Sequence, residues 1–547
     1  MTIKYTKEQL NKFDKDLLIE LFLGMQGQME ELSRQTQALN DRMQLMMEQM
    51  VLFQKNRFGR SSEKMADSEQ IRFMEVDGTI VFFNEAEAVC DLDAPEPDDL
   101  ELKASKKKKQ PGKKAADIAG LTVKRIDHYL KEEELTAEFG ENGWKQLPDA
   151  ISRCYQFIPA NVVIEEHHIG VYSSKLDEHM IKAPHPRNLL HGSLVSPSLA
   201  AAVINGKYVN AVPLYRLEKE FERYGLAITR QNMANWMIRL GEEYLGTMYD
   251  YLHKLLYDYH VIQADETPVL VNKDGRPAGS QSYMWVYRSG FMYRDRQIIL
   301  YEYQKTRNAS HPREFLRDYT GICVTDGYQV YHTLEKEREN LKIAGCWVHC
   351  RRRFNDALEV IPKAHRKESI LHLIMKQIQA IYREEGKLSD FSTEDRLMQR
   401  QLVVKPLVDA FFAYLKQNEP KIPKNGKIRE AFTYALNQES YLKVFLEDGD
   451  VPIDNNASER AIRGFCIGKK NWEMIDTVNG ANSSAIIYSI AETAKANNLK
   501  PFDYFEYLLT EIPKHVDDKN TDFLAELLPW SDMLPENIRK PQKASGK

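Results

Sequence analysis

Three acidic residues, Asp265, Asp326 and Glu459, have the chemistry of a metal-binding active site. Asp265 and Asp326 each follow a run of apolar residues that predicts a buried strand, so both carboxylates are expected where a strand ends and a loop begins. Glu459 lies far downstream, in a segment with helical character. Mg²⁺ and Mn²⁺ prefer oxygen ligands and need only two or three protein carboxylates besides water and substrate phosphate. We therefore expect these three residues to bind Mg²⁺ or Mn²⁺.

A site of this kind suits phosphoryl chemistry. Two ions about 3.5–4 Å apart can activate a water or a 3′-hydroxyl and stabilise the oxygen that leaves phosphorus. Two other acidic residues compete with Glu459 for the third position, namely Glu492, which also lies in a predicted helix, and Asp454. Glu459 is preferred because Asn456 and Ser458 are expected to cap the start of its helix and so fix its position.

The segments around these residues predict a mixed α/β core. Strand-like runs occur at 261–271, 283–288, 296–303, 321–325 and 342–348, with helices near 311–319 and after Tyr328. Such a mixture predicts an α/β layer, and the order of its elements resembles that of ribonuclease H-like nucleotidyl transferases. Residues 350–450 have an almost entirely helical pattern, which predicts an all-helical insertion ahead of Glu459.

The length and charge of the chain limit its function. The 547 residues predict about three or four domains. Lys plus Arg number 75 and Asp plus Glu number 80, so the formal net charge is −5 and any DNA binding must depend on local basic patches. Six scattered cysteines, together with the lack of an early signal or membrane segment, predict a cytoplasmic protein that associates with the nucleoid when it binds DNA.

The N-terminal region has a seven-residue apolar repeat. Leu18, Met25, Leu32, Leu39, Met46 and Phe53 follow this spacing, with a second, mostly apolar row four residues after each. Residues 1–64 therefore predict a self-associating coiled coil, and an amphipathic helix packed on its own protein is the alternative. Residues 65–115 predict a charged flexible linker, whose run of Lys106, Lys107, Lys108 and Lys109 either binds DNA phosphate or is simply solvated.

Residues 196–255 have a helix-turn-helix-like pattern. An amphipathic helix at 214–221 is followed by a turn at Gly225 and by a second helix that Thr229 can cap. Helix pairs of this kind occur both with and without DNA. In the DNA-binding interpretation, the candidate base or phosphate contacts are Arg230, Gln231 and Asn232.

Long phrases of the chain resemble the insertion sequence 66 family of bacterial DDE transposases. The most specific are Asp265-Glu266-Thr267-Pro268-Val269, Thr325-Asp326-Gly327-Tyr328 and Asp454-Asn455-Asn456-Ala457-Ser458-Glu459-Arg460-Ala461-Ile462-Arg463. Further matching segments, of which the first is 58–64 and the last is 527–530, extend the resemblance over nearly the whole chain. The resemblance implies that Asp265, Asp326 and Glu459 are the catalytic triad of an enzyme with two metal ions. It also implies binding of the element's inverted repeats, cleavage of double-stranded DNA, joining of 3′-hydroxyl ends to target DNA, and small accessory proteins of the same element.

Basic and aromatic residues near the predicted triad are further candidate DNA contacts: His349, Arg351, Arg352, Arg460, Arg463, Lys469, Lys470 and Trp472. We expect His349 and the arginines after it to contact phosphate rather than to take part in catalysis. The indole of Trp472 could stack on an unpaired base near the cut. A core tryptophan beside solvated lysines is the alternative interpretation.

The chain departs from the family in its cysteines. Members usually carry a zinc-binding module with paired Cys-x-x-Cys motifs, but Cys154 alone is present between 116 and 195. One thiolate cannot form a tetrahedral zinc site, so 116–195 predicts a small module without zinc. Cys346, His349 and Cys350 likewise lack a fourth ligand nearby. We therefore expect no zinc.

Two other functions remain open at this point. One is a decayed or repurposed transposase that only binds DNA or assembles on it, and the other is a nuclease of the same fold that cuts without joining. The predicted parts of the chain are 1–64, 65–115, 116–195 and 196–255 as described above, 256–349 and 451–512 as the two parts of the ribonuclease H-like core, 350–450 as the insertion, and 513–547 as a C-terminal tail.

Overall fold

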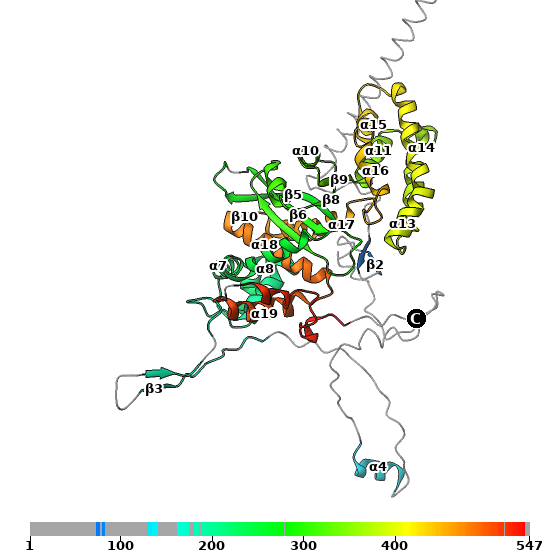
Figure 1. The fold of residues 1–547 in the computed structure, drawn as a ribbon. Helices are drawn as coiled ribbons and strands as arrows, with labels where there is room; N and C mark the ends of the chain where they lie inside the picture. The colour runs from blue at the N-terminus through cyan, green and yellow to red at the C-terminus, as the bar shows by residue number, and fades with distance from the viewer. Residues whose placement is uncertain are drawn as a thin grey trace, which may run out of the picture.

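A mixed β-sheet lies at the centre of the molecule. The computed structural model describes residues 73–76, 79–82, 130–140, 161–173, 180–184, 187–277, 279–518 and 520–541. The sheet has the order β7-β6-β5-β8-β9, formed by β5 (Val261–Lys273), β6 (Gln281–Ser289), β7 (Ile299–Gln304), β8 (Gly321–Thr325) and β9 (Leu341–Gly345) (Figure 1). β5 is antiparallel to β6 and parallel to β8. The predicted mixed α/β core is therefore confirmed.

A short strand that the pattern did not predict extends this sheet. β10 (Ile475–Thr477) pairs in parallel with the far end of β5, through Ile475 opposite Val271. Three residues are too few to show a period of two, which explains why the sequence pattern did not reveal the strand.

Helices cover both faces of the sheet. They include α8 (Gly246–Leu256), α9 (Ser310–Phe315), α10 (Gln329–Glu337), α17 (Asn456–Trp472) and α18 (Val478–Ala496). On β6, Tyr287 stacks on Phe315 of α9 with ring centroids 3.7 Å apart. On β7, Tyr301 pairs with Val286 and donates a hydrogen bond to the Ala461 carbonyl of α17. Because neighbouring residues of a strand point to opposite faces, α9 and α17 lie on opposite sides of the sheet.

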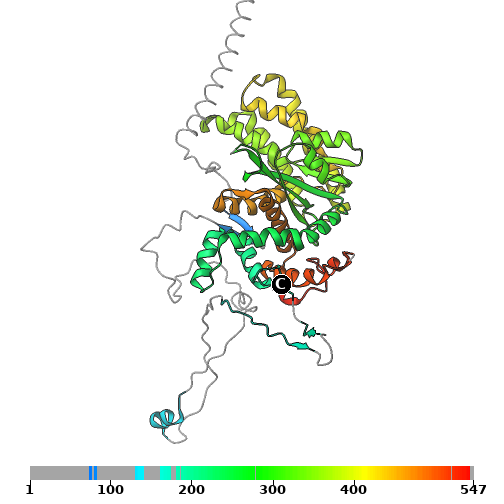
Figure 2. The ribbon, with the colours of Figure 1, turned by 90° about the vertical axis from the view of Figure 1, so that its left-hand side faces the viewer.

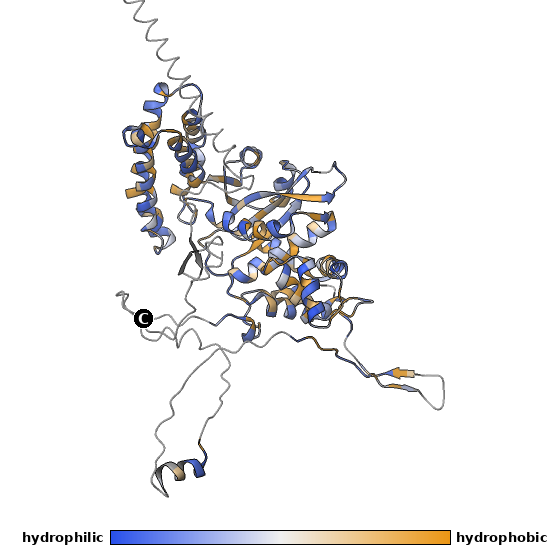
Figure 3. Ribbon diagram, turned by 180° about the vertical axis from the view of Figure 1, so that it is seen from behind, coloured by the Kyte–Doolittle hydropathy of each residue, from blue (hydrophilic) through white to orange (hydrophobic). Residues whose placement is uncertain are grey.

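The chain between β9 and α17 is helical, with a core of its own. Its helices are α11 (Trp347–Val360), α12 (Ile370–Gly386), α13 (Thr393–Gln399), α14 (Lys405–Asn418), α15 (Lys427–Asn437) and α16 (Glu439–Lys443). Trp347, Phe354 and Phe411 are buried at its centre, together with Ile322 and Val324 from β8. In Figures 1 and 2 these helices and α19 (Pro501–Glu511) lie at opposite ends of the folded part, and Figure 3 shows the insertion helices with alternating hydrophilic and hydrophobic colours, as amphipathic helices require.

A layer of helices precedes the sheet in the chain. It contains α5 (Pro197–Ile204), which continues into η2 (Asn205–Val209), α6 (Leu214–Arg223) and α7 (Arg230–Leu240). Gly225 adopts a positive φ of 81° between α6 and α7, and the Thr229 hydroxyl accepts the Asn232 N–H at 3.2 Å, so the predicted turn and cap are present.

The segment predicted as a C-terminal tail is folded. Leu524, Leu527, Leu528, Leu534 and Ile538 are buried in the same core as the sheet helices. The Tyr504 hydroxyl of α19 donates to the Leu527 carbonyl at 2.8 Å. Residues 520–541 therefore pack on the body of the protein instead of leaving it as a tail.

Short elements lie within the N-terminal ranges. β1 (Phe73–Val76) and β2 (Thr79–Phe82) form an antiparallel hairpin inside the range predicted as a linker, around an Asp-Gly pair that is a turn signal in the sequence. α4 (Glu132–Phe139) and the hairpin of β3 (Val171–Ser173) and β4 (Met180–Lys182) lie in the predicted small module. The predicted coiled coil and Lys106 to Lys109 lie outside the described residues. Within the described parts of the chain, no helix has the length and apolar character needed to cross a membrane.

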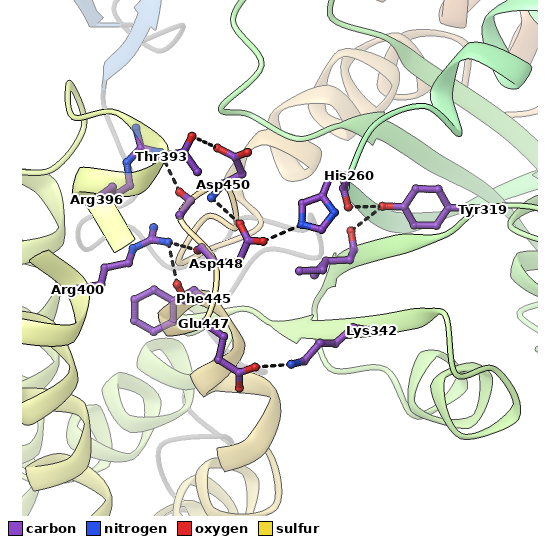
Figure 4. A network of polar contacts seen from close by, with 12 residues as sticks. His260, Tyr319, Lys342, Thr393, Arg396, Arg400, Phe445, Glu447, Asp448 and Asp450 are labelled. Carbon is purple, nitrogen blue, oxygen red and sulfur yellow. Dashed lines mark hydrogen bonds and ion pairs between the residues drawn. The ribbon is translucent and has the colours of Figure 1, made fainter. Parts of the chain in front are cut away.

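A polar network joins the insertion to the edge of the sheet (Figure 4). Arg400, whose side chain is only 1% exposed, pairs with Glu385 and donates to the carbonyls of Phe445 and Asp448 at 2.7 and 2.6 Å. The Asp448 carboxylate in turn lies 2.7 Å from His260 Nε2, immediately before β5. These contacts fix the insertion against the strand that carries Asp265.

The Arg400→Ala variant tests this network. We expect its free energy of unfolding to fall by about 3 kcal/mol or more, because Glu385 would be left as a largely buried, unpaired charge. Urea denaturation measures the change. Arg383→Ala on the same helix as Glu385 is the control, since Arg383 is 70% exposed and its ion pair contributes about 1 kcal/mol or less. Equal losses in the two variants would contradict the assignment.

Candidate active site

The three predicted carboxylates lie near one another. Asp265 is in β5, Asp326 directly follows β8, and Glu459 is in the first turn of α17. The pKa of Asp265 is raised well above its usual value, first by burial and then by the negative charges of Glu266, Asp326 and Glu459. The sequence separates these groups widely, but the fold brings them within electrostatic reach of one another.

The sequence predicted that Asp265 ends its strand, and this prediction is wrong because the strand continues beyond Asp265. β5 continues to Lys273 because its antiparallel pairing with β6 extends to Leu270 and its parallel pairing with β10 includes Val271 and Lys273. The parallel pairing with β8 stops earlier, at Gln263 opposite Val324. Asp265 therefore lies just beyond the point at which the pairing of β5 with β8 ends.

One buried amide joins the helix of Glu459 to the strand of Asp265. The Asn455 Oδ1 atom accepts a hydrogen bond from Gln263 Nε2 at 3.1 Å, and its Nδ2 donates to the Ala264 carbonyl at 2.8 Å. Asn455 is fully buried and its backbone N–H donates to Cys346 Sγ at 3.2 Å. This Asn455 contact fixes the start of α17 beside β5.

The predicted capping of α17 by Asn456 and Ser458 is wrong. Asn455 occupies the cap position, and the Asp454 carboxylate accepts hydrogen bonds from the backbone N–H and the side chain of Asn456 at 3.1 and 2.9 Å. The Ser458 hydroxyl is buried and has no hydrogen-bond partner among the described residues. An acidic residue just before a helix compensates the exposed N–H groups and the positive end of the helix dipole.

Asp454 and Glu492, the two alternatives to Glu459 as the third carboxylate, have other contacts. Asp454 is engaged at the start of α17, as just described. Glu492 lies on α18, where it pairs with Lys495 at 2.7 Å and lies beside Gly464, more than one helical turn after Glu459. Neither rival is among the charges that raise the pKa of Asp265.

Arg307 was not identified from the sequence, although it contacts two of the acidic groups. Its Nε donates to Glu266 Oε1 at 2.6 Å, and its Nη2 lies 3.9 Å from Asp326 Oδ2. The guanidinium lies 3.8 Å from the ring centroid of Tyr328, whose backbone N–H donates to Asp326 Oδ1 at 2.9 Å. An arginine in the loop after β7 has no distinctive sequence pattern, so only the fold could reveal this role.

Glu266 is the second group that the sequence did not single out. Its side chain is only 2% exposed, and burial, followed by the charge of Asp326, raises its pKa to about 7. Side chains alternate along a strand, so Glu266 lies on the opposite face of β5 from Asp265. The predicted strand already implied the face on which Glu266 lies. The sequence pattern gave no reason to expect that its carboxyl group would be buried.

His349 and Arg352, which were predicted to contact DNA, lie beside Glu459. His349 Nε2 is 4.0 Å from Glu459 Oε1, and Arg352 Nη2 is 3.6 Å from Oε2. Burial lowers the pKa of His349, and the charges of Asp326 and Glu459 oppose this effect. Glu459 is 17% exposed, and its Oε1 has no hydrogen-bond partner among the described residues.

The residue types fit a divalent cation. Carboxylate oxygens are its preferred ligands, and buried oxygens of Glu266 and Glu459 lack hydrogen-bond partners within the described chain. Yet no group of three or more His, Cys, Asp or Glu side chains in the described residues is arranged to hold a metal ion. Arg307 and Arg352 lie against the carboxylates instead. The carboxylates would have to move closer together to share an ion.

The other predicted DNA contacts are distributed over two regions. Lys469 donates to the Pro268 carbonyl of β5 at 2.8 Å, and Arg460 lies 5.5 Å from the ring centroid of Phe291. Trp472 is partly buried at the end of α17. Arg230, Gln231 and Asn232 occupy the first turn of α7. The exposed predicted contacts of α11 and α17 include Arg351, Arg460, Arg463 and Lys470.

The cysteines near the site are buried thiols. Cys346 Sγ accepts the Asn455 N–H, and burial raises the pKa of this thiol to about 12. Burial also raises the pKa of Cys350. Thiolate is the form that binds zinc, and this environment disfavours it.

The Asn455→Ala variant tests the contact between α17 and β5. We expect the free energy of unfolding to fall by about 2 kcal/mol, because the Gln263 amide and the Ala264 carbonyl would lose a buried partner. Denaturant titration measures the loss. Asn418→Ala is the matched control, since the Asn418 amide donates to the Tyr414 carbonyl of its own helix and to no other described residue. Similar losses in both variants would show that the Asn455 contact is unimportant.

The buried carboxyl of Glu266 should make stability depend on pH. Its pKa is about 7 when folded against 4.5 ordinarily, so folding favours the neutral form and stability falls as pH rises through this window. The free energy of unfolding of Glu266→Gln minus that of the wild type should therefore be larger at pH 8 than at pH 5, by about 3 kcal/mol at most. Glu337→Gln is the control and should show little change between pH 5 and pH 8, because Arg313 lowers the pKa of Glu337 and both pH values lie above the range in which this carboxyl titrates. A Glu266→Gln difference that is independent of pH would contradict the assignment.

Family models match most of the chain. The model described as "Transposase IS66 family" matches residues 192–483, more than half of the 547 residues. "IS66 C-terminal element" matches 489–530, and "Transposase C of IS166 homeodomain" matches 45–126. The first match contains the sheet, the insertion and all three carboxylates, and the second contains α19 and the first part of the folded C-terminal segment.

Individual proteins are also similar to this chain. Uncharacterized protein y4qI of Sinorhizobium fredii is 28% identical over 66% of this chain and 67% of its own length. Uncharacterized protein y4jD of the same organism is 24% identical over 76% of this chain and 82% of its own. The solved Mos1 transposase paired-end complex with left transposon end is 14% identical over 49% of this chain and 81% of its own, with a TM-score of 0.13. On the evidence of the family models, the chain belongs to the IS66 family of transposases.

Proposed function

We propose that this transposase binds the inverted repeats of its insertion element, cleaves the DNA there and joins the resulting 3′-hydroxyl ends to target DNA. The observation that carries the proposal is the convergence of Asp265, Asp326 and Glu459 from two strands and one helix, expressed in the raised pKa of Asp265. Desolvated acidic clusters of this kind destabilise a protein unless a cation is bound, and they are therefore typical of functional sites.

The order of the sheet supports a ribonuclease H-like core. Three antiparallel strands lead to two parallel ones, with the first carboxylate on β5, the second after β8 and the third on a later helix. The helical segment from α11 to α16 interrupts this core between β9 and α17. The proposed core is thus 256–349 with 451–512, and 350–450 is the insertion.

The proposed triad would hold Mg²⁺ or Mn²⁺ through its carboxylate oxygens. When bound, two such ions supply charge stabilisation at phosphorus and lower the pKa of the attacking hydroxyl. Arg307 and Arg352 balance the carboxylate charges in the present arrangement and can turn to phosphate oxygens when the carboxylates are otherwise neutralised. The buried His349 Nδ1 atom lacks a partner among the described residues.

DNA and protein partners follow from the remaining residues. The proposed DNA contacts are those predicted from the sequence, with the exposed Arg351, Arg463 and Lys470 as phosphate contacts. Self-association through 1–64, DNA contact by Lys106 to Lys109 and accessory proteins of the same element remain predictions.

The Asp326→Asn variant tests the proposal. It keeps the size of the side chain but removes its charge, so strand transfer in Mg²⁺ should fall by roughly 1,000-fold or more. The substrate is a duplex with the end repeats of the element, and DNA affinity, measured by fluorescence anisotropy, should change by about twofold or less because phosphate contacts remain.

The control for this test is Asp318→Asn, which alters an exposed aspartate that pairs with Arg317 at 3.6 Å. This variant should retain wild-type transfer. Undiminished transfer by Asp326→Asn would refute the triad, and cut ends without joined strands from the wild type would indicate a nuclease instead.

A further inference from the structure

A pocket of about 490 Å³ lies between the helix-turn-helix-like pair and the far end of α17. The residues that line it include Lys207 of η2, Arg230 and Gln231 of α7, Trp472 at the end of α17 and Tyr488 of α18. Segments far apart in the sequence therefore share one cavity, whose size is typical of small-ligand sites.

We propose that this pocket binds one nucleotide of a DNA strand whose base has left the helical stack. The inference rests on the proposed function, namely that the chain acts on DNA, and adds a specific subsite to it.

Two buried polar atoms in the pocket lining lack partners. Trp472 Nε1 and the Tyr488 hydroxyl form no acceptable hydrogen bond with any described residue, and Tyr488 is only 1% exposed. The two groups lie near each other beside Gly468, and the indole opposes the increase in the pKa of Tyr488 that burial causes, yet their geometry is too poor for a hydrogen bond. The edge of a nucleobase that enters between these two side chains would offer the Trp472 N–H an acceptor and the Tyr488 hydroxyl a donor or an acceptor.

The pocket also contains cations without ion-pair partners. In the described chain, Lys207 and Arg230 contact the aromatic rings of Tyr208 and Tyr215 and form no ion pair within 4.0 Å. The lining carboxylate, Asp476, is paired with Lys273 at 2.6 Å. A phosphate group is therefore the ligand that complements these cations, and an indole nearby suits a base, as in single-strand binding sites.

One helix sets the distance from this pocket to the carboxylates. Glu459 and Trp472 lie 472 − 459 = 13 residues apart on α17, which corresponds to ~20 Å along the helix axis at about 1.5 Å per residue. At about 3.4 Å per base along one strand, this is roughly six nucleotides. A nucleotide held at Trp472 would thus position the DNA strand relative to Asp265, Asp326 and Glu459.

The experiment compares two fluorescein-labelled duplexes that differ by one unpaired thymidine in a single-nucleotide bulge. The full-length protein should bind the bulged duplex roughly tenfold more tightly, which is the contribution of about one stacked base. Trp472→Ala should reduce this ratio to about one, because the base that leaves the stack loses its stacking partner. Trp472→Phe should retain part of the ratio, because a phenyl ring can still stack.

Two further variants separate binding from folding. Tyr488→Phe removes a hydroxyl without a partner, so it should lower the ratio without lowering the melting temperature. Trp530→Ala is the matched control, since Trp530 is also partly buried but does not line the pocket. A wild-type ratio near one, or an unchanged ratio in both Trp472→Ala and Tyr488→Phe, would overturn the proposal.

Failure of the pocket and failure of the proposed function can be told apart. Asp326→Asn should lose strand transfer but keep the preference for the bulged duplex. A wild-type protein that prefers the bulge without any strand transfer would refute the proposed function and leave the nucleotide pocket intact. Strand transfer without a preference for the bulge would refute the pocket alone.

Discussion

The site depends first on the buried amide of Asn455. Its contacts with Gln263 and Ala264 join chain segments about 190 residues apart, and they do so with hydrogen bonds that have definite directions. Apolar packing alone allows a helix to slide slightly over a sheet. An amide that makes two directed hydrogen bonds fixes a single register of the helix against the strand. The positions of Glu459 and, at the other end of the same helix, Trp472 follow from this register.

The carboxylate cluster, in contrast to the Asn455 contacts, is energetically unfavourable. Asp265, Glu266, Asp326 and Glu459 bring negative charges together in a partly buried region, and the pKa values of Asp265 and Glu266 rise accordingly. Arg307, Arg352 and His349 reduce this repulsion without removing it. Folding therefore tolerates an unfavourable local arrangement, which is common where a protein binds a cation or a phosphate.

Local patterns predicted much of this architecture, and non-local contacts account for the differences. The strands from β5 to β9 and the helices of the insertion have their own periodicity, so the order of the elements and the presence of Asp265 and Asp326 near a shared edge could be read from the sequence. The length of β5 depends on pairing with β6, and the cap of α17 depends on Asp454. Arg307 and the burial of Glu266 arise only from tertiary packing, which no sequence spacing describes.

The two ends of the insertion meet at one point. The chain leaves β9 at Cys346 and Trp347 and returns at Ile453, and the Trp347 N–H donates to the Ile453 carbonyl at 3.1 Å. In topological terms, the whole segment is a loop whose ends are already closed. Loops with closed ends can change in length at little entropic cost to the rest of the chain. The length of this helical layer can therefore change without separating the end of β9 from the start of α17.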